Sequence, residues 1–363
     1  IRVRGSGHSV APAIYTDALL EGKPGAVDVM LDRYKRISFD DAHMRVTVEA
    51  GCNLGVDPRD PTGGSRWENS LLAALEARGW ALPDLGGVTH QTVSGFLMTG
   101  SSGGSLTHAI EDAVVAIRII DGLGNVHDIE RGRDERFDAV VCSMGLCGIV
   151  SRITFQCVPR YDVIGREDIT PADATAFGLF DGEPHGLAAF LKRTEYARLM
   201  WWPQRGVDRV VTWQARRMVD SDYDDETGPR GALRPRQYSA FGDLPEGRFS
   251  KPASDAVQWA GGKFYDALDS ASQARRAFEA RLPFAAPLGR AASGLFEAHV
   301  LPTVLKQFVP VDTDGPQRFW DRWCDGLPMD NQMSDASLPT TFTEIFLPIE
   351  HTARAMRLLR NHF

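Results

Sequence analysis

The stretch RVRGSGHSV, residues 2–10, runs from an alternating strand into a turn with two glycines, where a lone histidine, His8, stands beside a serine. Two more glycine-rich stretches follow, LGGVTHQTVSGFLMTGSSGGS at 85–105 and GLCGIV at 145–150. Glycine lets the backbone approach a ligand closely and presents N–H groups to an anion. Each stretch alone is equally compatible with an ordinary tight turn. The three together predict a large anionic cofactor, such as a dinucleotide.

Two other nucleotide-binding folds are excluded by the same stretches. A Rossmann fingerprint, G-x-G-x-x-G, follows a strand and opens a helix, and an acidic residue comes about 20 residues later. The segment GSGHSVAP at 5–12 lacks the third glycine, and Pro12 with a polar stretch follows where that helix would begin. The chain contains no G-x-x-x-x-G-K-[ST] motif either, which excludes a P-loop nucleotidase.

The overall composition is that of an ordinary globular protein. The chain has 363 residues, 43% of them hydrophobic and 24% charged, and this length favours two domains. A net charge of −8 and the lack of a dense Lys/Arg run argue against nucleic acid as a partner. No apolar run is long enough for a membrane span. Five irregularly spaced cysteines predict no disulfide framework, so we expect a cytoplasmic location.

The first part of the chain, residues 1–158, is predicted to be an α+β domain. The segment RWENSLLAALEARGW predicts a helix, with Asn69 or Ser70 as its N-cap and Gly79 as its end. The segment 121–129 predicts a hairpin, because Gly-Asn stands between two apolar runs. β-branched runs that end near Gly, Asp or Pro predict strands at 43–51, 112–121 and 148–158.

The second part, residues 159–363, has longer polar connections between its predicted strands. ARLMWWP places Trp201 and Trp202 at alternating positions, for which core packing is the default and a wall of a substrate cavity is the alternative. The acidic and then basic segment 220–237 lacks a core-forming pattern, which predicts a surface loop or a partly disordered excursion. TFTEIFLPIE at 341–350 predicts an alternating strand that stops at a proline, and an amphipathic helix follows.

The order and spacing of these motifs resemble the vanillyl-alcohol-oxidase-type flavoproteins. RVRGSGHS, VTVEAG, LPDLGGVTHQTVSGFLMTGSSGGS and GLCGIVSRITF match the FAD-binding domain, and the WWP strand and LPTTFTEIFLPIE are similar to the sugar-lactone and alditol oxidase branch. The resemblance implies an α+β, two-domain PCMH-type fold. Residues 1–158 would bind FAD, and 159–363 would form a substrate-binding cap built on an antiparallel sheet flanked by helices. It also implies that parts of the family's sequence lie before residue 1 and after residue 363.

The resemblance gives His8 a chemical role. In this family the histidine of the G-x-G-H-S turn carries FAD through a bond from its ring to the flavin 8α-methyl group, and His8 occupies that position. Neutral imidazole is a suitable nucleophile near pH 7. A His8 that only contacts an unlinked flavin, or one that bonds a loop carbonyl, remains as an alternative. Some relatives attach FAD through a cysteine of the second loop as well, but this loop holds none, so one linkage is expected.

Two sets of FAD contacts follow from the resemblance. The first is the turn that contains His8, and the second surrounds the pyrophosphate and ribityl chain, while Ile149 would meet the adenine or flavin through its backbone. The implied residues are Arg4, Gly5, Ser6, Gly7, His8, Ser9, Gly87, Thr92, Gly95, Thr99, Gly100, Ser101, Ser102 and Ile149.

Neither the other histidines nor the cysteines of the chain receive a chemical role. No metal site is expected, because no ligand spacing relates His90, His108 and His299. Three of the cysteines are predicted to be small buried strand residues: Cys142, Cys147 and Cys157.

Glu344 is the candidate for substrate binding. In aldonolactone and alditol oxidases a glutamate on the matching strand helps to hold the substrate hydroxyls, usually with an arginine two residues later. Alternation places Glu344 on one face with Phe342 and Phe346, either in a pocket or at an exposed sheet edge. Phe346 stands where the family has the arginine, which implies a less polar pocket floor.

The resemblance implies an oxidase that moves a hydride from an alcohol carbon of a polyol or sugar lactone to FAD, with O2 as the acceptor and H2O2 as the product. One alternative is a dehydrogenase of the same fold that acts on a less polar alcohol and passes electrons to another acceptor. An alternative of a different class is a non-catalytic carbohydrate-binding protein that uses the tryptophans as a stacking platform. The family's alcohol-activating histidine and lysine would lie beyond residue 363.

Overall fold

The computed structural model describes residues 1–9, 14–58, 60–224, 228–229, 263, 299, 301–313, 315–328 and 345–363. The chain divides into two compact units, Ile1–Val163 with Arg322–Asp330 and Ile164–Asp321 with Asn331–Phe363. The expected boundary after residue 158 falls shortly before the observed division. Nothing in the sequence pattern predicts that the later segment Arg322–Asp330, here called the returning segment, belongs to the first unit. The functional roles given to the two domains stay predictions.

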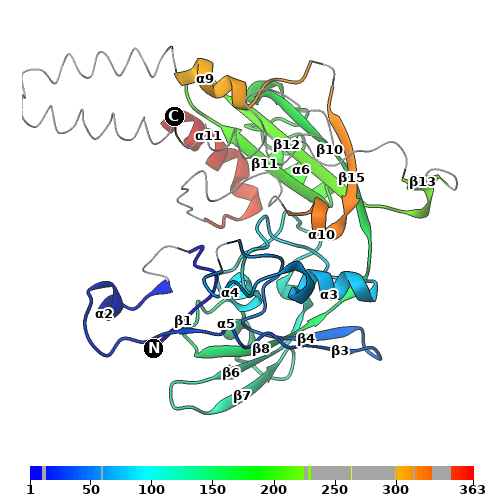
Figure 1. Cartoon of the computed structure of the whole chain (residues 1–363). Helices are drawn as coiled ribbons and strands as arrows, with labels where there is room; N and C mark the ends of the chain where they lie inside the picture. Colours follow the sequence, from blue (N-terminus) through cyan, green and yellow to red (C-terminus); the bar gives the residue numbers. More distant parts are fainter. Residues whose placement is uncertain are drawn as a thin grey trace, which may run out of the picture. The chain divides into compact units, whose positions relative to one another are not determined.

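A five-stranded antiparallel sheet is the frame of the first unit, in the order β3-β4-β8-β6-β7 (Figure 1). Ile120 of β6 pairs with Val126 of β7, which confirms the predicted hairpin. Val46, Ile153 and Phe155 are buried on the central strands, so the β-branched runs form a core as expected. The strands are β3 (Ile37–Asp40), β4 (Arg45–Glu49), β6 (Val114–Ile120), β7 (Val126–Glu130) and β8 (Ile149–Gln156).

Helix α3 (Leu71–Arg78) begins and ends where its capping residues require. The side chain of Ser70 accepts a hydrogen bond from the Ala73 N–H at 3.2 Å, so Ser70 is the N-cap and Asn69 is not. Gly79 ends the helix at a φ of 71°, a left-handed conformation that glycine adopts without strain. Two shorter helices contact strands β8 and β6: α4 (Val93–Met98) and α5 (Phe137–Val141).

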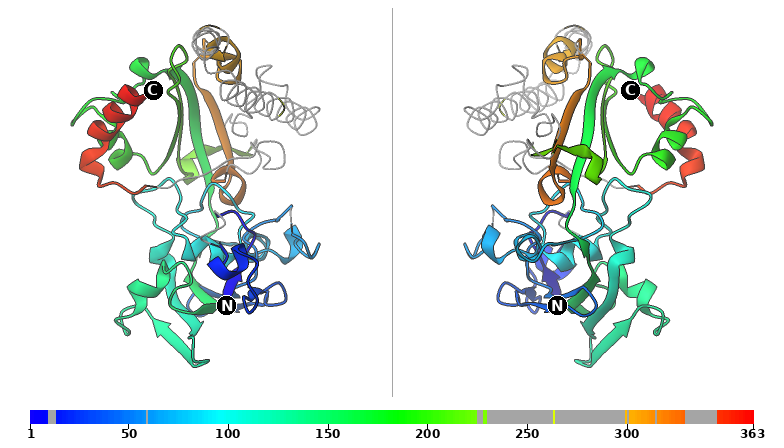
Figure 2. Two further views of the ribbon diagram at one scale, coloured as in Figure 1. Left: turned by 90° about the vertical axis from the view of Figure 1, so that its left-hand side faces the viewer. Right: turned by 90° about the vertical axis from the view of Figure 1, so that its right-hand side faces the viewer.

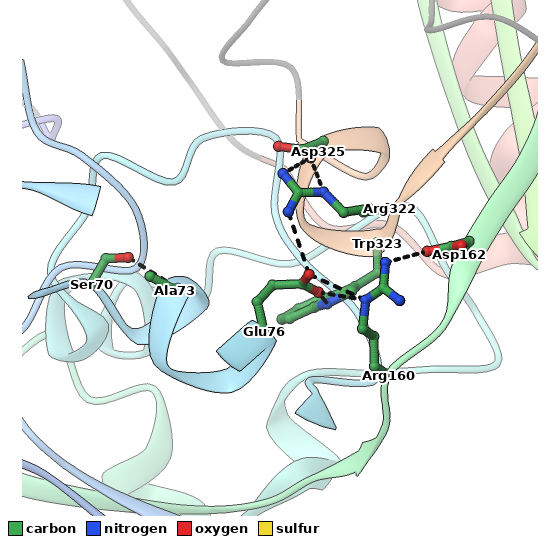
Figure 3. A network of polar contacts seen from close by, with 8 residues as sticks. All are labelled: Ser70, Ala73, Glu76, Arg160, Asp162, Arg322, Trp323 and Asp325. Carbon is green, nitrogen blue, oxygen red and sulfur yellow. Dashed lines mark hydrogen bonds and ion pairs between the residues drawn. The ribbon is translucent and has the colours of Figure 1, made fainter. Parts of the chain in front are cut away.

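The carboxylate of Glu76, on α3, joins three segments of the first unit (Figure 3). It accepts hydrogen bonds from Trp323 Nε1 at 2.6 Å and Arg160 Nε at 3.2 Å. It also pairs with Arg322 Nη1 at 3.5 Å. Trp323 begins helix α10 (Trp323–Gly326) and is fully buried. These contacts fasten the returning segment to α3 and explain why it belongs to the first unit.

A four-stranded sheet in the order β11-β12-β10-β15 is the frame of the second unit. Its two faces are covered by different helices, α6 and α11 on one and α9 on the other (Figure 2). Trp201 packs with the cluster that includes Phe190 of α6, and Trp202 packs with the cluster that includes Leu305 of α9. The two tryptophan side chains therefore pack against different core clusters on opposite faces of the sheet, as their alternation predicts. The elements are β10 (Asp162–Pro171), β11 (Tyr196–Trp202), β12 (Arg209–Arg217), β15 (Gln317–Arg322), α6 (Leu187–Arg193), α9 (Leu301–Phe308) and α11 (Thr352–His362).

The remaining described elements are short. None of the described helices is long and apolar enough to cross a membrane. The short elements are β1 (Arg2–Arg4), β2 (Asp28–Met30), β5 (Trp80–Ala81), β9 (Val158–Pro159), β13 (Tyr223–Asp224), β14 (Gly228–Pro229), α2 (Asp17–Leu20) and the 3₁₀ turns Trp67–Asn69, Glu111–Ala113, Ala172–Ala174, Asp220–Asp222 and Ile349–His351.

The structure corrects the prediction for the strand at 341–350. Thr341–Glu344 lie outside the described residues, and residues 345–348 form no strand. Phe346 is 69% exposed, which favours the exposed alternative over a pocket floor at this position. Alternation is only a weak sign of a strand when no neighbouring strand pairs with the segment, and that is the case for the described part here.

The prediction that three cysteines are buried strand residues is also wrong for two of them. Cys142 directly follows α5 and Cys147 lies in the glycine-flanked turn before β8, and both are exposed. Cys157 is buried directly after β8, and Cys52 is buried as well. Burial raises the pKa of both the Cys52 and the Cys157 thiol to about 12.

This difference predicts a selective reaction with iodoacetamide in the native protein. We expect alkylation of Cys142 and Cys147 only, because the buried thiols carry almost no thiolate near neutral pH. Peptide mass spectrometry after a short exposure measures this, and denaturation before alkylation should add the three buried cysteines. Labelling of Cys157 in the folded protein would contradict the burial described above.

Candidate functional site

A cavity of about 110 Å³ lies between the first glycine turn and the start of α4, within the first unit. Pockets that enclose a whole drug-sized ligand measure about 300–1,000 Å³, so this one would hold only part of a dinucleotide. The predicted cofactor residues that line it are Arg4, Gly5, Ser6, Gly7, His8, Ser9, Thr92, Gly95 and Thr99.

The wall of the cavity depends on two glycines that face one hydroxyl group. Strand β1 pairs in parallel with β2, and the chain then turns at Gly5 toward α4. A Cβ on Gly5 would lie 2.5 Å from Thr92 Oγ1, and one on Gly95 would lie 2.9 Å from the same atom. Thr92 itself is fixed as the N-cap of α4, since its hydroxyl accepts from the Gly95 N–H at 3.2 Å. Glycine at both positions therefore lets the turn and the helix meet.

We expect the variant Gly5→Ala to reduce the stability of the first unit by about 1–3 kcal/mol, as overpacking of a tight contact does. The added methyl group has to displace the Thr92 side chain and with it the cap of α4. Gly122→Ala is the matched control, because no atom lies within 4 Å of the methyl group there. Urea titrations followed by circular dichroism compare the two. Equal midpoints would refute the close contact between Gly5 and Thr92.

Hydrogen bonds tie the first turn to the segment before α4. Ser6 Oγ donates to the His90 carbonyl at 2.7 Å. The buried Asn53 donates to the same carbonyl at 3.1 Å and to Ser6 Oγ at 3.3 Å. Lys35 donates to Asn53 Oδ1 at 3.4 Å. The His8 and His90 rings then lie with their centroids 5.7 Å apart and tilted by 39°.

The other predicted cofactor residues do not line the cavity. Ser101 supports it indirectly, since its hydroxyl contacts Thr99 Oγ1 and accepts from Gln91 Nε2, each at 3.2 Å. Gly148 and Val150, which flank the predicted Ile149, line the cavity instead. The predicted residues outside the lining are Gly87, Gly100, Ser101, Ser102 and Ile149.

Sequence reasoning missed part of the lining. Most of these residues lie inside the glycine-rich stretches, where a motif marks a segment but not which side chains face the ligand. Met144 and Ile14 carry no sequence signal, because folding alone brings them to the turn. The missed residues are Val3, Ile14, Gln91, Ser94, Met98, Met144, Gly145, Gly148 and Val150.

The charges at the turn suit an anionic cofactor. Arg4 Nε is buried and has no hydrogen-bond partner among the described residues. It would lie 3.8 Å from a Cβ on Gly7, so it sits directly behind the turn. Burial raises the pKa of Asp28 on the neighbouring strand, and Arg4 offsets part of that rise. A buried guanidinium N–H with unused bonding capacity fits a phosphate oxygen, so the residues present fit FAD.

The rest of the predicted site is not seen. Glu344 lies outside the described residues. Within the described part of the chain, no group of His, Cys, Asp and Glu side chains is arranged to hold a metal ion.

Comparison with known proteins finds relatives among lactone oxidases. D-arabinono-1,4-lactone oxidase of Saccharomyces cerevisiae is 26% identical over 224 residues, which are 60% of this chain and 36% of that protein. L-gulonolactone oxidase of Mus musculus is 28% identical over 207 residues, 56% of this chain and 40% of that protein. The matches therefore span less than half of each relative. No protein-family model matches the chain.

Solved structures show the same fold over nearly the whole chain. Cholesterol oxidase from B. sterolicum has a TM-score of 0.52 at 13% identity and covers 99% of this chain and 59% of its own. A mutant of that enzyme from Brevibacterium sterolicum also reaches 0.52, at 14% identity, with 99% of this chain and 60% of its own covered. The fold is thus that of the vanillyl-alcohol-oxidase-type, FAD-linked oxidases. In sequence, the chain is similar to the D-arabinono-1,4-lactone and L-gulonolactone oxidases, which confirms the resemblance seen in its motifs.

Proposed function

We propose that this protein is an FAD-dependent oxidase that takes a hydride from an alcohol carbon of a polyol or sugar lactone, with the flavin bonded to His8 and O2 as the acceptor. The observation that carries the proposal is the position of His8 on the wall of the cavity, in a turn whose glycines and buried Arg4 Nε suit a dinucleotide. The lactone oxidases among the relatives support the class of substrate.

The residues of the chain take separate parts in this function. His8 would hold the flavin, and Arg4 with the main-chain N–H groups of the turn would bind its pyrophosphate. FAD, when bound, supplies the acceptor for the hydride. Thr92 and Gly95 keep the start of α4 against the turn, so that the cofactor meets a rigid surface. Trp201 and Trp202 are partly buried and each packs against a core cluster, which supports a packing role for these two side chains over a stacking platform.

Anaerobic mixing with candidate substrates tests the function. The purified protein, loaded with FAD, is mixed with D-arabinono-1,4-lactone, L-gulono-1,4-lactone, an alditol, a sterol and a simple alcohol, and loss of the flavin absorbance is followed. We expect bleaching by a lactone or alditol, and recovery with peroxide release when air is admitted. Bleaching that only a dye reverses would favour a dehydrogenase. A folded protein that takes up no FAD would refute the proposal.

A further inference from the structure

Two exposed cysteines lie on either side of the tight turn 143–146, and the proposed function does not use them. Cys142 is the C-cap of α5, and Cys147 directly precedes Gly148. We propose that these two thiols are a peroxide-sensitive pair, which hydrogen peroxide joins as a disulfide, and that the disulfide fixes the turn between them at the cavity. The reactivity of the pair is independent of the flavin, and only the source of the peroxide rests on the proposed function.

The backbone between the two cysteines doubles back in a turn of the kind that closes β-hairpins. The Leu146 N–H donates to the Ser143 carbonyl at 2.9 Å. Met144 and Gly145, the two central residues, have φ angles of 52° and 73°. Positive φ at both central positions is the mark of a type I′ turn, which reverses the direction of the chain. The residue before the turn and the residue after it are therefore brought toward each other.

A second contact places the Cys147 side chain at the end of α5. Its sulfur lies 3.8 Å from the Ala139 carbonyl oxygen. Ala139 comes three residues before Cys142, and residues three apart are neighbours on a helix surface. Residues that face each other across antiparallel segments have Cα atoms about 4.5–5.5 Å apart, and a disulfide spans about 4.4–6.8 Å. Rotation about the Cα–Cβ bonds would then join the two sulfurs.

The turn between the cysteines is part of the cavity wall. Met144 and Gly145 line the cavity. The Met144 N–H donates to the Met98 carbonyl at the end of α4 at 2.9 Å, and the Met144 carbonyl accepts from Arg2 Nη1 at 3.2 Å. A left-handed φ is costly for a residue with a side chain, so these bonds hold Met144 in the turn against that cost. A disulfide at the base of the turn would hold it covalently and reduce the movement of this wall.

The oxidation balances with peroxide as the sole co-reactant. The sulfur of one cysteine attacks a peroxide oxygen and the O–O bond breaks, which leaves a sulfenic acid and, with the thiol proton, one water. The second thiol attacks the sulfenic sulfur, so that the S–S bond forms, the S–O bond breaks and a second water leaves. The two thiols lose two electrons and two protons, which the peroxide takes up. The proposed oxidase would release this peroxide at the cavity that the turn lines.

One tryptic peptide reports the reaction, because residues 137–152 contain both cysteines and no other. The reduced protein is treated with hydrogen peroxide, the remaining thiols are alkylated with iodoacetamide, and the peptide is measured without reduction. We expect a peptide without alkyl groups that is lighter than the unmodified one by two hydrogen masses. Treatment with dithiothreitol before alkylation should bring back both alkyl groups. A peptide that keeps both alkyl groups, or one that carries a sulfinic acid instead, overturns the inference.

Single variants separate a disulfide from damage to each thiol alone. Cys142→Ser and Cys147→Ser each leave one thiol of the pair, so neither should lose two hydrogen masses, and the remaining thiol should oxidise further to a sulfinic acid. The buried Cys157 is the internal control and should stay unmodified in the folded protein. A wild-type disulfide that joins two copies of the chain, seen as a dimer on a non-reducing gel, would contradict pairing within one chain.

Uptake of FAD tests the effect on the cavity wall. Protein produced under riboflavin limitation is oxidised with peroxide or kept reduced, then mixed with FAD, and quenching of the flavin fluorescence is followed. We expect slower uptake by the oxidised wild type, recovery with dithiothreitol, and no effect of peroxide on the double variant Cys142→Ser/Cys147→Ser. Equal rates in the two states would refute the fixing of the wall. A protein that takes up no FAD in either state overturns the proposed function, while the peptide measurement still decides whether the thiols pair.

Discussion

Replacement of Trp323 by alanine is expected to lower the free energy of unfolding of the first unit by about 3–5 kcal/mol, the range for truncation of a fully buried large aromatic residue. The indole is completely buried and its ring contacts Tyr161, whose hydroxyl donates to the Leu82 and Pro83 carbonyls at 3.0 and 3.1 Å. Truncation would therefore leave a cavity and also remove one of the two hydrogen bonds to Glu76 Oε1, which keeps its bond from Arg160 Nε at 3.3 Å. Both losses fall where the returning segment meets α3.

Two further variants separate packing from hydrogen bonding. Trp323→Phe keeps most of the buried surface but removes the indole N–H, so it should cost about 1.5–3 kcal/mol, the contribution of one hydrogen bond to a charged group. Leu123→Ala is the control at the tip of the β6–β7 hairpin, where the side chain is 89% exposed, and it should change stability by less than about 0.5 kcal/mol. Urea titrations of the whole chain, followed by far-UV circular dichroism, rank the three. An equal effect of Trp323→Ala and Leu123→Ala would show that α10 does not belong to the core of the first unit.

The local features of the fold could be predicted because they depend on neighbouring residues. A serine before a leucine-rich run and a glycine after it define both ends of α3. Gly-Asn between two apolar runs defines the β6–β7 hairpin, since the turn type and the strands agree. Trp201 and Trp202 go to opposite core clusters because side chains alternate along any strand. None of these outcomes requires knowledge of distant contacts.

The candidate site could be predicted only in part, because its decisive contacts join distant segments. The link between Ser6, Asn53 and His90 spans three segments and has no periodic signal. The prediction of buried strand positions is wrong for Cys142 and Cys147, because both lie exposed in turns outside the strands. Motif resemblance identified the turn that carries His8, and folding determined that the imidazole of His90 lies against it.

The largest effect on the cofactor is expected from His8→Ala. This variant should hold no covalent flavin at all, because the imidazole nitrogen that forms the bond is gone. Arg4, Thr92 and Gly95 remain on the cavity wall, so non-covalent FAD should still bind and be released by acid. Intact mass before and after denaturation, with fluorescence of the precipitated pellet, measures both forms.

The exposed cysteines provide the decisive control for that variant. A Cβ on Gly100 would lie 2.8 Å from Cys142 Sγ, so a thiol does stand near the second glycine stretch, and Cys147 lies in the third. The double variant Cys142→Ser/Cys147→Ser should keep its flavin fully covalent if the imidazole is the sole point of attachment. A different result would indicate that the flavin is bonded to a thiol and not to the imidazole. In that case the His8→Ala pellet would still contain flavin, and the pellet of the double cysteine variant would contain none. The first turn would then keep only its role in binding the pyrophosphate, since Arg4 and the glycines act without a covalent bond.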